Sequence, residues 1–157
     1  MDLIQRVRQI AEKLLADLEP IASRLSNVAE DQLYPAVAES LHHCLRNLEE
    51  LHVWGPENRL PSSELWNAAA HLLERGWLQN RARTKPRGYA GDYEMLARIY
   101  ENRRCDDPLG RLFDRYFQEE AAPRAVQNRM RMMADWIVEL ASGGRESARG
   151  EIGRAHV

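Results

Sequence analysis

The sequence predicts an all-α protein, an irregular bundle of about six helices interrupted by one loop that contains glycine and proline. Apolar residues recur at steps of three and four along most of the 157-residue chain, which is the spacing of one helix face. No segment of useful length alternates apolar and polar residues, as a half-buried strand would. Residues 81–91 interrupt the pattern with a dense set of glycine, proline, tyrosine and charged residues.

Two apolar stripes predict the first two helices. One runs from Leu3 to Leu25 and the other from Leu33 to Leu51. Pro20 lies inside the first stripe, so we expect a kink or break just before it, because proline lacks the donor that an interior turn needs. Pro35 suits the first turn of the second helix, where that donor has no partner anyway. The sequence WGPEN at residues 54–58 should end this helix.

The next segments predict three more helices around the loop. A third helix should cover residues 60–77, with Ser62 or Ser63 as its N-cap, since a hydroxyl can accept from a free N–H of the first turn. After the loop, Asp92 can cap a short helix in the same way. The sequence DDPLG then restarts the chain, with apolar residues from Leu109 to Phe117 on one face.

A last helix is predicted from Val126 to Leu140. Its methionines Met130, Met132 and Met133 are expected to fill the core, as flexible methionine side chains often do. Residues 143–150 are rich in glycine and serine and predict a flexible, linker-like tail behind an N-terminal helical domain of residues 1–142.

The last seven residues, EIGRAHV at 151–157, suggest an origin outside the gene. Back-translated as GAG ATC GGA AGA GCA CAC GTC, they match the start of a common short-read sequencing adapter. We therefore expect a processing artefact and exclude this segment from the fold prediction. On this interpretation the chain is a fragment whose natural continuation is missing.

Charge and cysteine usage restrict the class of protein. The net charge is −2, but residues 1–80 carry 7 Lys/Arg against 12 Asp/Glu, whereas residues 81–131 carry 12 against 8. The basic segment favours an anionic or acidic partner only weakly. The two cysteines form no metal-binding or disulfide pattern, and no apolar run is long enough to span a membrane. A cytoplasmic location is expected.

The loop is the candidate functional site. An extended segment from Arg81 to Arg87 would place its cations on one side, and the two glycines permit sharp turns. The tyrosine rings with their polar ends suit a pocket wall. The candidate site residues are Arg83, Lys85, Arg87, Gly88, Tyr89, Gly91, Asp92 and Tyr93. The alternative is a solvated basic loop with turn glycines and a helix cap.

Other sites are not predicted. No metal-ligand spacing, Ser-His-Asp order or HExxH motif is present, so neither a metal nor a catalytic residue can be assigned. The chain also lacks a strand–GxGxG–helix unit, and therefore has no nucleotide or S-adenosylmethionine site of the Rossmann type.

The sequence TKPRGYAGDYEMLARIY at residues 84–100 resembles a signature that precedes the catalytic domain in a group of bacterial class I S-adenosylmethionine-dependent methyltransferases. Some of these are annotated in biosynthesis of 3-hydroxypalmitate methyl ester, an extracellular signal. The segment DDPLGRLFDRYFQEEAAPRAVQNRMRMMADWI is also similar to these proteins. The resemblance covers residues 81 to about 140 and is vague over residues 1–80.

The resemblance implies that the chain is the N-terminal helical part of such a methyltransferase. This part would pack on a missing C-terminal Rossmann-like domain that binds S-adenosylmethionine, while the fragment alone would bind no cofactor and be inactive. It would form a substrate cap for a small-molecule methyl acceptor, of a carboxylate or fatty-acyl type. Arg83, Lys85 and Arg87 would then orient a carboxylate, and Tyr89, Asp92 and Tyr93 would orient hydroxyl groups.

Two alternatives remain open. A non-catalytic helical protein-interaction or regulatory module also fits the acidic first half and the long amphipathic stripes. RNA binding through the basic loop is disfavoured, because the local net charge is only +4 over residues 81–131 and no RNA-binding signature is present. We therefore expect no nucleic-acid partner.

Overall fold

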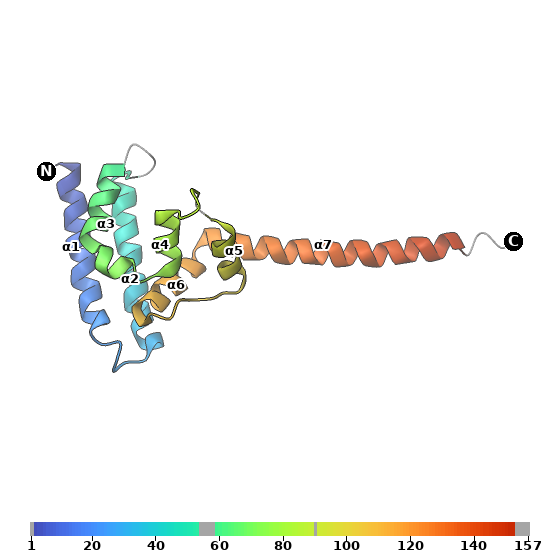
Figure 1. The fold of residues 1–157 in the computed structure, drawn as a ribbon, viewed down its shortest axis with the longest axis horizontal. Helices are drawn as coiled ribbons and strands as arrows, with labels where there is room; N and C mark the ends of the chain where they lie inside the picture. Colours follow the sequence, from blue (N-terminus) through green and yellow to red (C-terminus); the bar gives the residue numbers. More distant parts are fainter. Residues whose placement is uncertain (1, 54–58, 90, 153–157) are drawn as a thin grey trace.

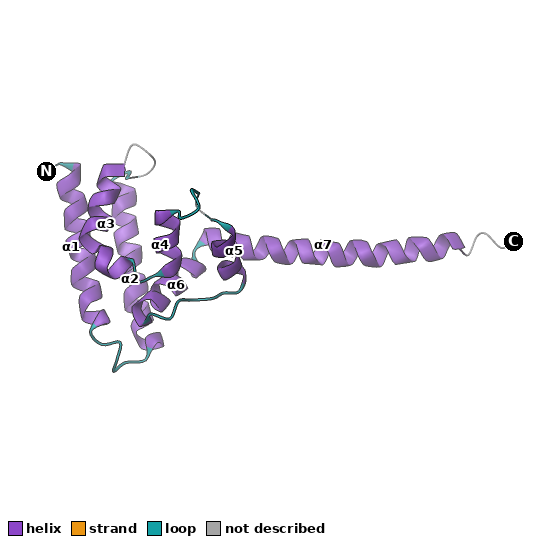
Figure 2. Ribbon diagram, in the orientation of Figure 1, coloured by secondary structure: helices purple, strands orange, loops and turns teal. Residues whose placement is uncertain are grey.

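The computed structural model describes residues 2–53, 59–89 and 91–152, and over these residues it contains helices and no strand. The helices are α1 (Leu3–Ala22), α2 (Glu30–Glu50), α3 (Arg59–Leu73), α4 (Trp77–Thr84), α5 (Tyr93–Tyr100), α6 (Pro108–Glu119) and α7 (Ala121–Ile152). Figure 1 shows their order and Figure 2 the absence of strands among the described residues. The all-α prediction is confirmed. The predicted helix end at residues 54–58 lies outside the described residues, as do residues 153–157 of the adapter-like segment.

The larger apolar core lies between four helices. α1 packs against α2 and α3, and α6 lies against α2 (Figure 1). The stripes predicted from sequence supply this core: Val7, Leu18 and Val37 are fully buried, and Phe113 of α6 closes it. Because a fully buried side chain of this kind contributes about 1.5–3 kcal/mol, this cluster is the main source of stability.

A second, smaller apolar cluster supports the loop. It is formed by Leu78 of α4 with Met95 and Ile99 of α5, and Phe117 and Val126 pack against it. α4 and α5 therefore share one apolar cluster, and they pack against α6 and α7, respectively. The loop between them is consequently held at both ends.

Three aspartates cap helix N-termini. Asp2 accepts from the N–H of Gln5 at 2.8 Å, and Asp107 accepts from that of Gly110 at 2.8 Å. The predicted cap of α5 is confirmed, because Asp92 accepts from the N–H groups of Glu94 and Met95. Each such cap satisfies a donor that has no partner within the helix.

The break allowed for at Pro20 does not occur, and Pro35 is not in the first turn of its helix. α1 continues through Pro20 to Ala22, and Pro35 lies in the second turn of α2, since that helix begins at Glu30. The carbonyls that lose a donor belong to Ala16 and Asp31, and both residues are exposed. Water can satisfy these carbonyls, so the helices tolerate proline on their solvent side.

The predicted third helix, residues 60–77, corresponds to α3, which ends earlier, at Leu73. α3 begins at Arg59, which puts Ser62 and Ser63 inside the helix, so neither is its N-cap. The chain breaks at Gly76. A β-carbon at Gly76 would lie 2.9 Å from Cβ of Phe113, so glycine allows α6 to approach this turn. This close approach is a tertiary contact that local sequence does not reveal.

α7 differs from its prediction in two ways. The helix continues to Ile152, through residues 143–150 where a flexible tail was predicted. Arginine, glutamate and alanine in that segment favour a helix and outweigh the turn signal of its glycines. Met130, Met132 and Met133 are 43–53% exposed, so the prediction that they fill the core is wrong. α7 projects away from the bundle (Figure 1), and no described element covers this face.

Candidate functional site

The loop between α4 and α5 is shorter than predicted and is not extended at its start. Residues Arg81 to Thr84 belong to α4, so Arg81 and Arg83 point about 200° apart around the helix axis. The prediction of cations on one side of an extended segment is wrong. Helix is favoured here because Leu78, in the first turn of α4, donates its N–H to Asp114 of α6 at 2.8 Å.

Left-handed residues shape the loop. Lys85 ends α4 with φ 47°, and Gly88 and Gly91 have φ 82° and 72°. The N–H of Gly88 donates to the carbonyl of Lys85 at 2.7 Å. Because glycine adopts such angles without a steric penalty, the two glycines have the turning role that the sequence predicts.

Asp92 is the buried centre of the loop. Its carboxylate is 1% exposed and accepts from Nε of Arg81 at 2.9 and 2.8 Å. The same arginine contacts Glu94 at 2.7 Å through Nη2. Since Asp92 also caps α5, one carboxylate joins the last turn of α4 to the first turn of α5. We call Arg81, Arg87, Asp92, Tyr93 and Glu94 the loop cluster.

Arg87 completes the loop cluster on its exposed side. Its Nη2 donates to the hydroxyl of Tyr93 at 2.8 Å and to the carboxylate of Glu94. Its guanidinium also lies 4.5 Å from the centre of the Tyr93 ring, a cation–π distance. The side chain remains 42% exposed, so Arg87 is accessible to a ligand although it is already paired.

The cluster changes the pKa of both acids in the same direction. Burial raises the pKa of Asp92, but the hydrogen bonds from Arg81 and the backbone outweigh it, and the pKa lies below its ordinary value. The hydrogen bond from Arg87 holds the pKa of Glu94 below its ordinary value. Both acids are therefore ionised at neutral pH, and neither is suited to accept a proton there.

Besides the two glycines, three of the predicted site residues lie outside the loop cluster. Arg83 points toward α3, where it donates to the hydroxyl of Ser62 at 3.2 Å and lies 4.8 Å from the Trp66 ring centre. Lys85 is exposed, and its ammonium group has no ion-pair partner among the described residues. Tyr89 is 53% exposed. The structure thus brings together Arg87, Asp92 and Tyr93, but not Arg83.

The site contains residues that sequence reasoning missed. Each of the three ion pairs of the loop cluster includes Arg81 or Glu94. Trp77 lies between two arginines, with Arg81 at 4.9 Å and Arg98 at 4.0 Å from its ring centre. If residues 77–84 had been predicted as a helix, Trp77 and Arg81 would have been placed one turn apart, on the same face.

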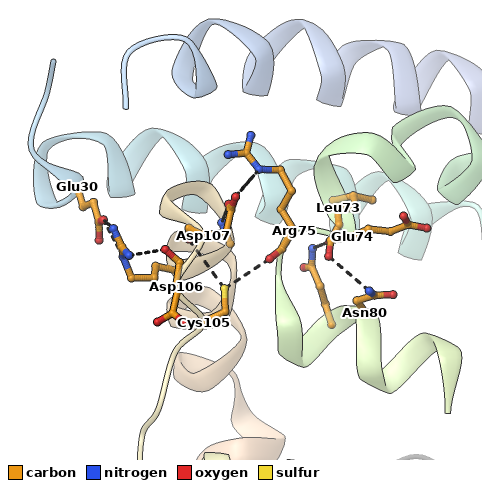
Figure 3. Close-up of polar contacts among 11 residues, drawn as sticks. Glu30, Leu73, Glu74, Arg75, Asn80, Cys105, Asp106 and Asp107 are labelled. Carbon is orange, nitrogen blue, oxygen red and sulfur yellow. Dashed lines mark hydrogen bonds and ion pairs between the residues drawn. The ribbon is translucent and has the colours of Figure 1, made fainter. Parts of the chain in front are cut away.

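A polar junction on the other side of α4 positions the site. Nε of Arg75 donates to Asp107 at 2.9 and 3.1 Å, and the thiol of Cys105 donates to the Arg75 carbonyl at 3.4 Å (Figure 3). Arg111 binds the carbonyl of Asp106 at 2.7 Å and the carboxylate of Glu30. These contacts fix the turn between α3 and α4 against the start of α6.

Asp114 adds a buried link to this junction. It is fully buried and accepts from the N–H groups of Leu78 and Cys105, each at 2.8 Å. Burial raises the pKa of Asp114 above its ordinary value, although both N–H groups counteract this. Each carboxylate oxygen accepts from one backbone N–H, so Asp114 joins α4 and the segment before α6.

The loop between α4 and α5 thus presents a small exposed face beside the ion pairs of the loop cluster. Lys85, Arg87, Tyr89 and Tyr93 can offer cations, hydroxyls and ring faces to an anionic or hydroxyl-bearing ligand. Over the described residues, no three acids, cysteines or histidines are arranged to hold a metal ion. Within the same residues no helix has the length and apolar character to cross a membrane. No protein-family model, curated protein or solved structure matches this chain.

Proposed function

We propose that this chain is the N-terminal helical substrate cap of an S-adenosylmethionine-dependent methyltransferase. The observation that carries the proposal is the loop cluster, in which the segment that resembles the methyltransferase signature forms a rigid base with an exposed polar face. The chain would hold a methyl acceptor of a carboxylate or fatty-acyl type. A carboxylate acceptor would meet Lys85 and Arg87, and Tyr89 and Tyr93 would flank it.

The described residues do not form a Rossmann-type site for S-adenosylmethionine. They contain no strand and therefore no strand–glycine loop–helix unit of the kind that binds this cofactor in a Rossmann-like domain. The proposal assigns the cofactor to a separate C-terminal domain, and this chain contributes only to holding and orienting the acceptor. Orientation of this kind is a large part of what an enzyme supplies in a two-substrate reaction.

The exposed face of α7 supports the presence of such a domain. Met130, Met133, Ile137 and Leu140 follow one another at helical spacing and are 43–76% exposed. Apolar patches of this kind mark interaction surfaces. The resemblance places the Rossmann-like domain next to this helix, so the proposal assigns the face to that domain.

The same face also favours a second candidate, a non-catalytic helical interaction module. In that case α7 would bind the apolar face of a partner helix, as an amphipathic helix does in a groove. The two functions differ in the loop between α4 and α5, because an interaction module based on α7 does not need Lys85 or Tyr89.

Calorimetric titration of S-adenosylmethionine separates the two functions. The titration would use this chain and a version extended by its natural downstream sequence. We expect binding to the extended protein alone. Binding to this chain itself would contradict the assignment of the cofactor to a separate domain, and no binding to either protein would favour the interaction module.

The role of the loop can be tested in the extended protein with lysine variants. Lys85→Ala should lower kcat/KM for a carboxylate acceptor about tenfold, because a charge-assisted hydrogen bond is lost. The matched control is Lys13→Ala, in an exposed ion pair with Asp17 on α1, which should retain full activity. Equal activity of wild type and Lys85→Ala would remove Lys85 from the site.

A further inference from the structure

The structure contains an apolar pocket inside the bundle, away from the loop cluster. Its volume is 380 Å³, which lies in the range of pockets that hold small organic ligands. Side chains from six helices meet in it, from Leu14 of α1 and Leu41 of α2 to Ala122 at the start of α7. We call this the core pocket.

The walls of the core pocket define the chemistry of an occupant. Leu14, Leu41 and Leu73 form its buried part and are 2–7% exposed, while Trp66 and Phe117 add aromatic rings. The thiol of Cys44 lies in the same wall, and burial raises its pKa to about 11, so it is uncharged at neutral pH. Glu120 is the one charged side chain among the lining residues.

The shape of the core pocket distinguishes a small molecule from a protein partner. A partner helix needs an elongated groove along one or two elements. Here six helices converge, and the pocket reaches inward to Leu14, which is 2% exposed. The shape of such a space suits a compact ligand better than a helix that lies along a groove.

We propose that the core pocket binds a neutral, largely apolar small molecule, whose bound state stabilises the contact between α2, α3 and the junction of α6 with α7. An anion is disfavoured because no cation lines the pocket and Glu120 lies at the exposed α6–α7 junction. This inference is independent of the proposed methyltransferase function, since it involves no residue of the loop cluster.

The test uses N-phenyl-1-naphthylamine, a neutral fluorescent probe, with a plugging variant and its neighbour. Ala122→Trp adds a ring at an exposed position that lines the core pocket, and Ala121→Trp adds the same ring at an exposed position that does not. We expect saturable binding of one probe to wild type, about tenfold weaker binding to Ala122→Trp, and unchanged binding to Ala121→Trp.

A second arm excludes binding to α7. The variant Met133→Glu/Ile137→Glu removes apolar surface from α7 outside the core pocket and should bind the probe as wild type does. The anionic analogue 8-anilinonaphthalene-1-sulfonate should bind more weakly, and Glu120→Gln should reduce the difference. The proposal is overturned by absent binding, by equal binding to wild type and Ala122→Trp, or by loss of binding in the α7 variant.

Discussion

At the scale of single residues, a few side chains hold segments together that are distant in sequence. Asp92 joins α4 to α5, Asp114 joins α4 to the segment before α6, and Gly110 lets α6 approach the carbonyl of Arg75. Each of these residues can be changed without touching the apolar stripes. Single substitutions at these positions therefore test the junctions separately from the core.

Gly110→Ala should destabilise the protein. A β-carbon at this position would lie 2.1 Å from the carbonyl oxygen of Arg75 and 2.6 Å from Sγ of Cys105, so α6 would have to shift. We expect a loss of about 1–3 kcal/mol in the free energy of unfolding, although alanine is the better helix former. Urea unfolding measures the change.

Gly88→Ala is the matched control for this substitution. No atom lies within 4 Å of its added carbon, but its φ of 82° is unfavourable for alanine. The cost should be about 1–2 kcal/mol and purely conformational. Equal stability of Gly110→Ala and wild type would show that the close approach of α6 is not required.

Asp92→Asn should change how stability depends on pH. The folded-state pKa of Asp92 lies below its ordinary value of 3.8, so the unfolded chain binds more protons as the pH falls. The stabilisation is therefore complete above this value and is lost as the pH falls through the folded-state pKa. Asn can still cap α5, so the variant isolates the charge.

Urea unfolding of wild type and Asp92→Asn at a series of pH values checks this prediction. The two proteins should differ most near neutral pH and converge in acid. Asp135→Asn, at an exposed position of α7, is the control and should follow wild type throughout. A difference between wild type and Asp92→Asn that is constant over the acid range would contradict the ionic role of Asp92.

At the scale of elements, sequence predicts what depends on local chemistry. The stripes of α1, α2 and α6 and the cap of α5 are visible in the sequence, because helical spacing and an N-cap aspartate act within one or two turns. The close approach of Phe113 to Gly76 and the hydrogen bond from the N–H of Leu78, in the first turn of α4, to Asp114 both involve α6. Such contacts cannot be read from neighbouring residues.

In the candidate site, too, features set by local chemistry were predicted and contacts between distant residues were not. The loop glycines and the Asp92 cap were predicted, whereas the pairing of Arg81 and Arg87 with Asp92 and Glu94 was not. An arginine was expected to face a ligand, but a buried carboxylate needs a partner in the fold. The methionines of α7 were misjudged because apolar spacing predicts which face is apolar and says nothing of what covers that face.

Ile137→Glu should reduce self-association of the protein. Ile137 is 65% exposed on the apolar face of α7, and a charge there opposes contact between apolar faces. Asn128→Glu is the control, because it adds the same charge to the opposite side of the helix. Sedimentation velocity over a range of protein concentrations measures the effect. Equal association of both variants would show that the protein does not self-associate through this face.

At the scale of the whole molecule, the distal part of α7 that the structure describes buries no residue against the bundle. Residues 128–142 are exposed throughout, whereas Val126 packs on the smaller apolar cluster and Gln127 donates to the carbonyl of Ile99 at 2.9 Å. The bundle thus includes the first two turns of α7 and none of the helix described beyond them.

A chain that ends at Asn128 should therefore fold with nearly unchanged stability. Its midpoint of urea unfolding should match that of the longer chain, since no buried surface is removed. A chain that ends at Glu120 should be less stable, because it loses Val126, Gln127 and the buried Pro123. Equal loss of stability in both shortened chains would contradict this separation.

The carboxylate of Asp114 also has a consequence for dynamics. Its two oxygens hold the amides of Leu78 and Cys105, which belong to different segments of the chain. Because α6 carries Asp114, a movement of α6 away from these segments removes the acceptor of both amides at once. Hydrogen exchange at these two sites should therefore be correlated, with one opening free energy shared by residues that are remote in sequence.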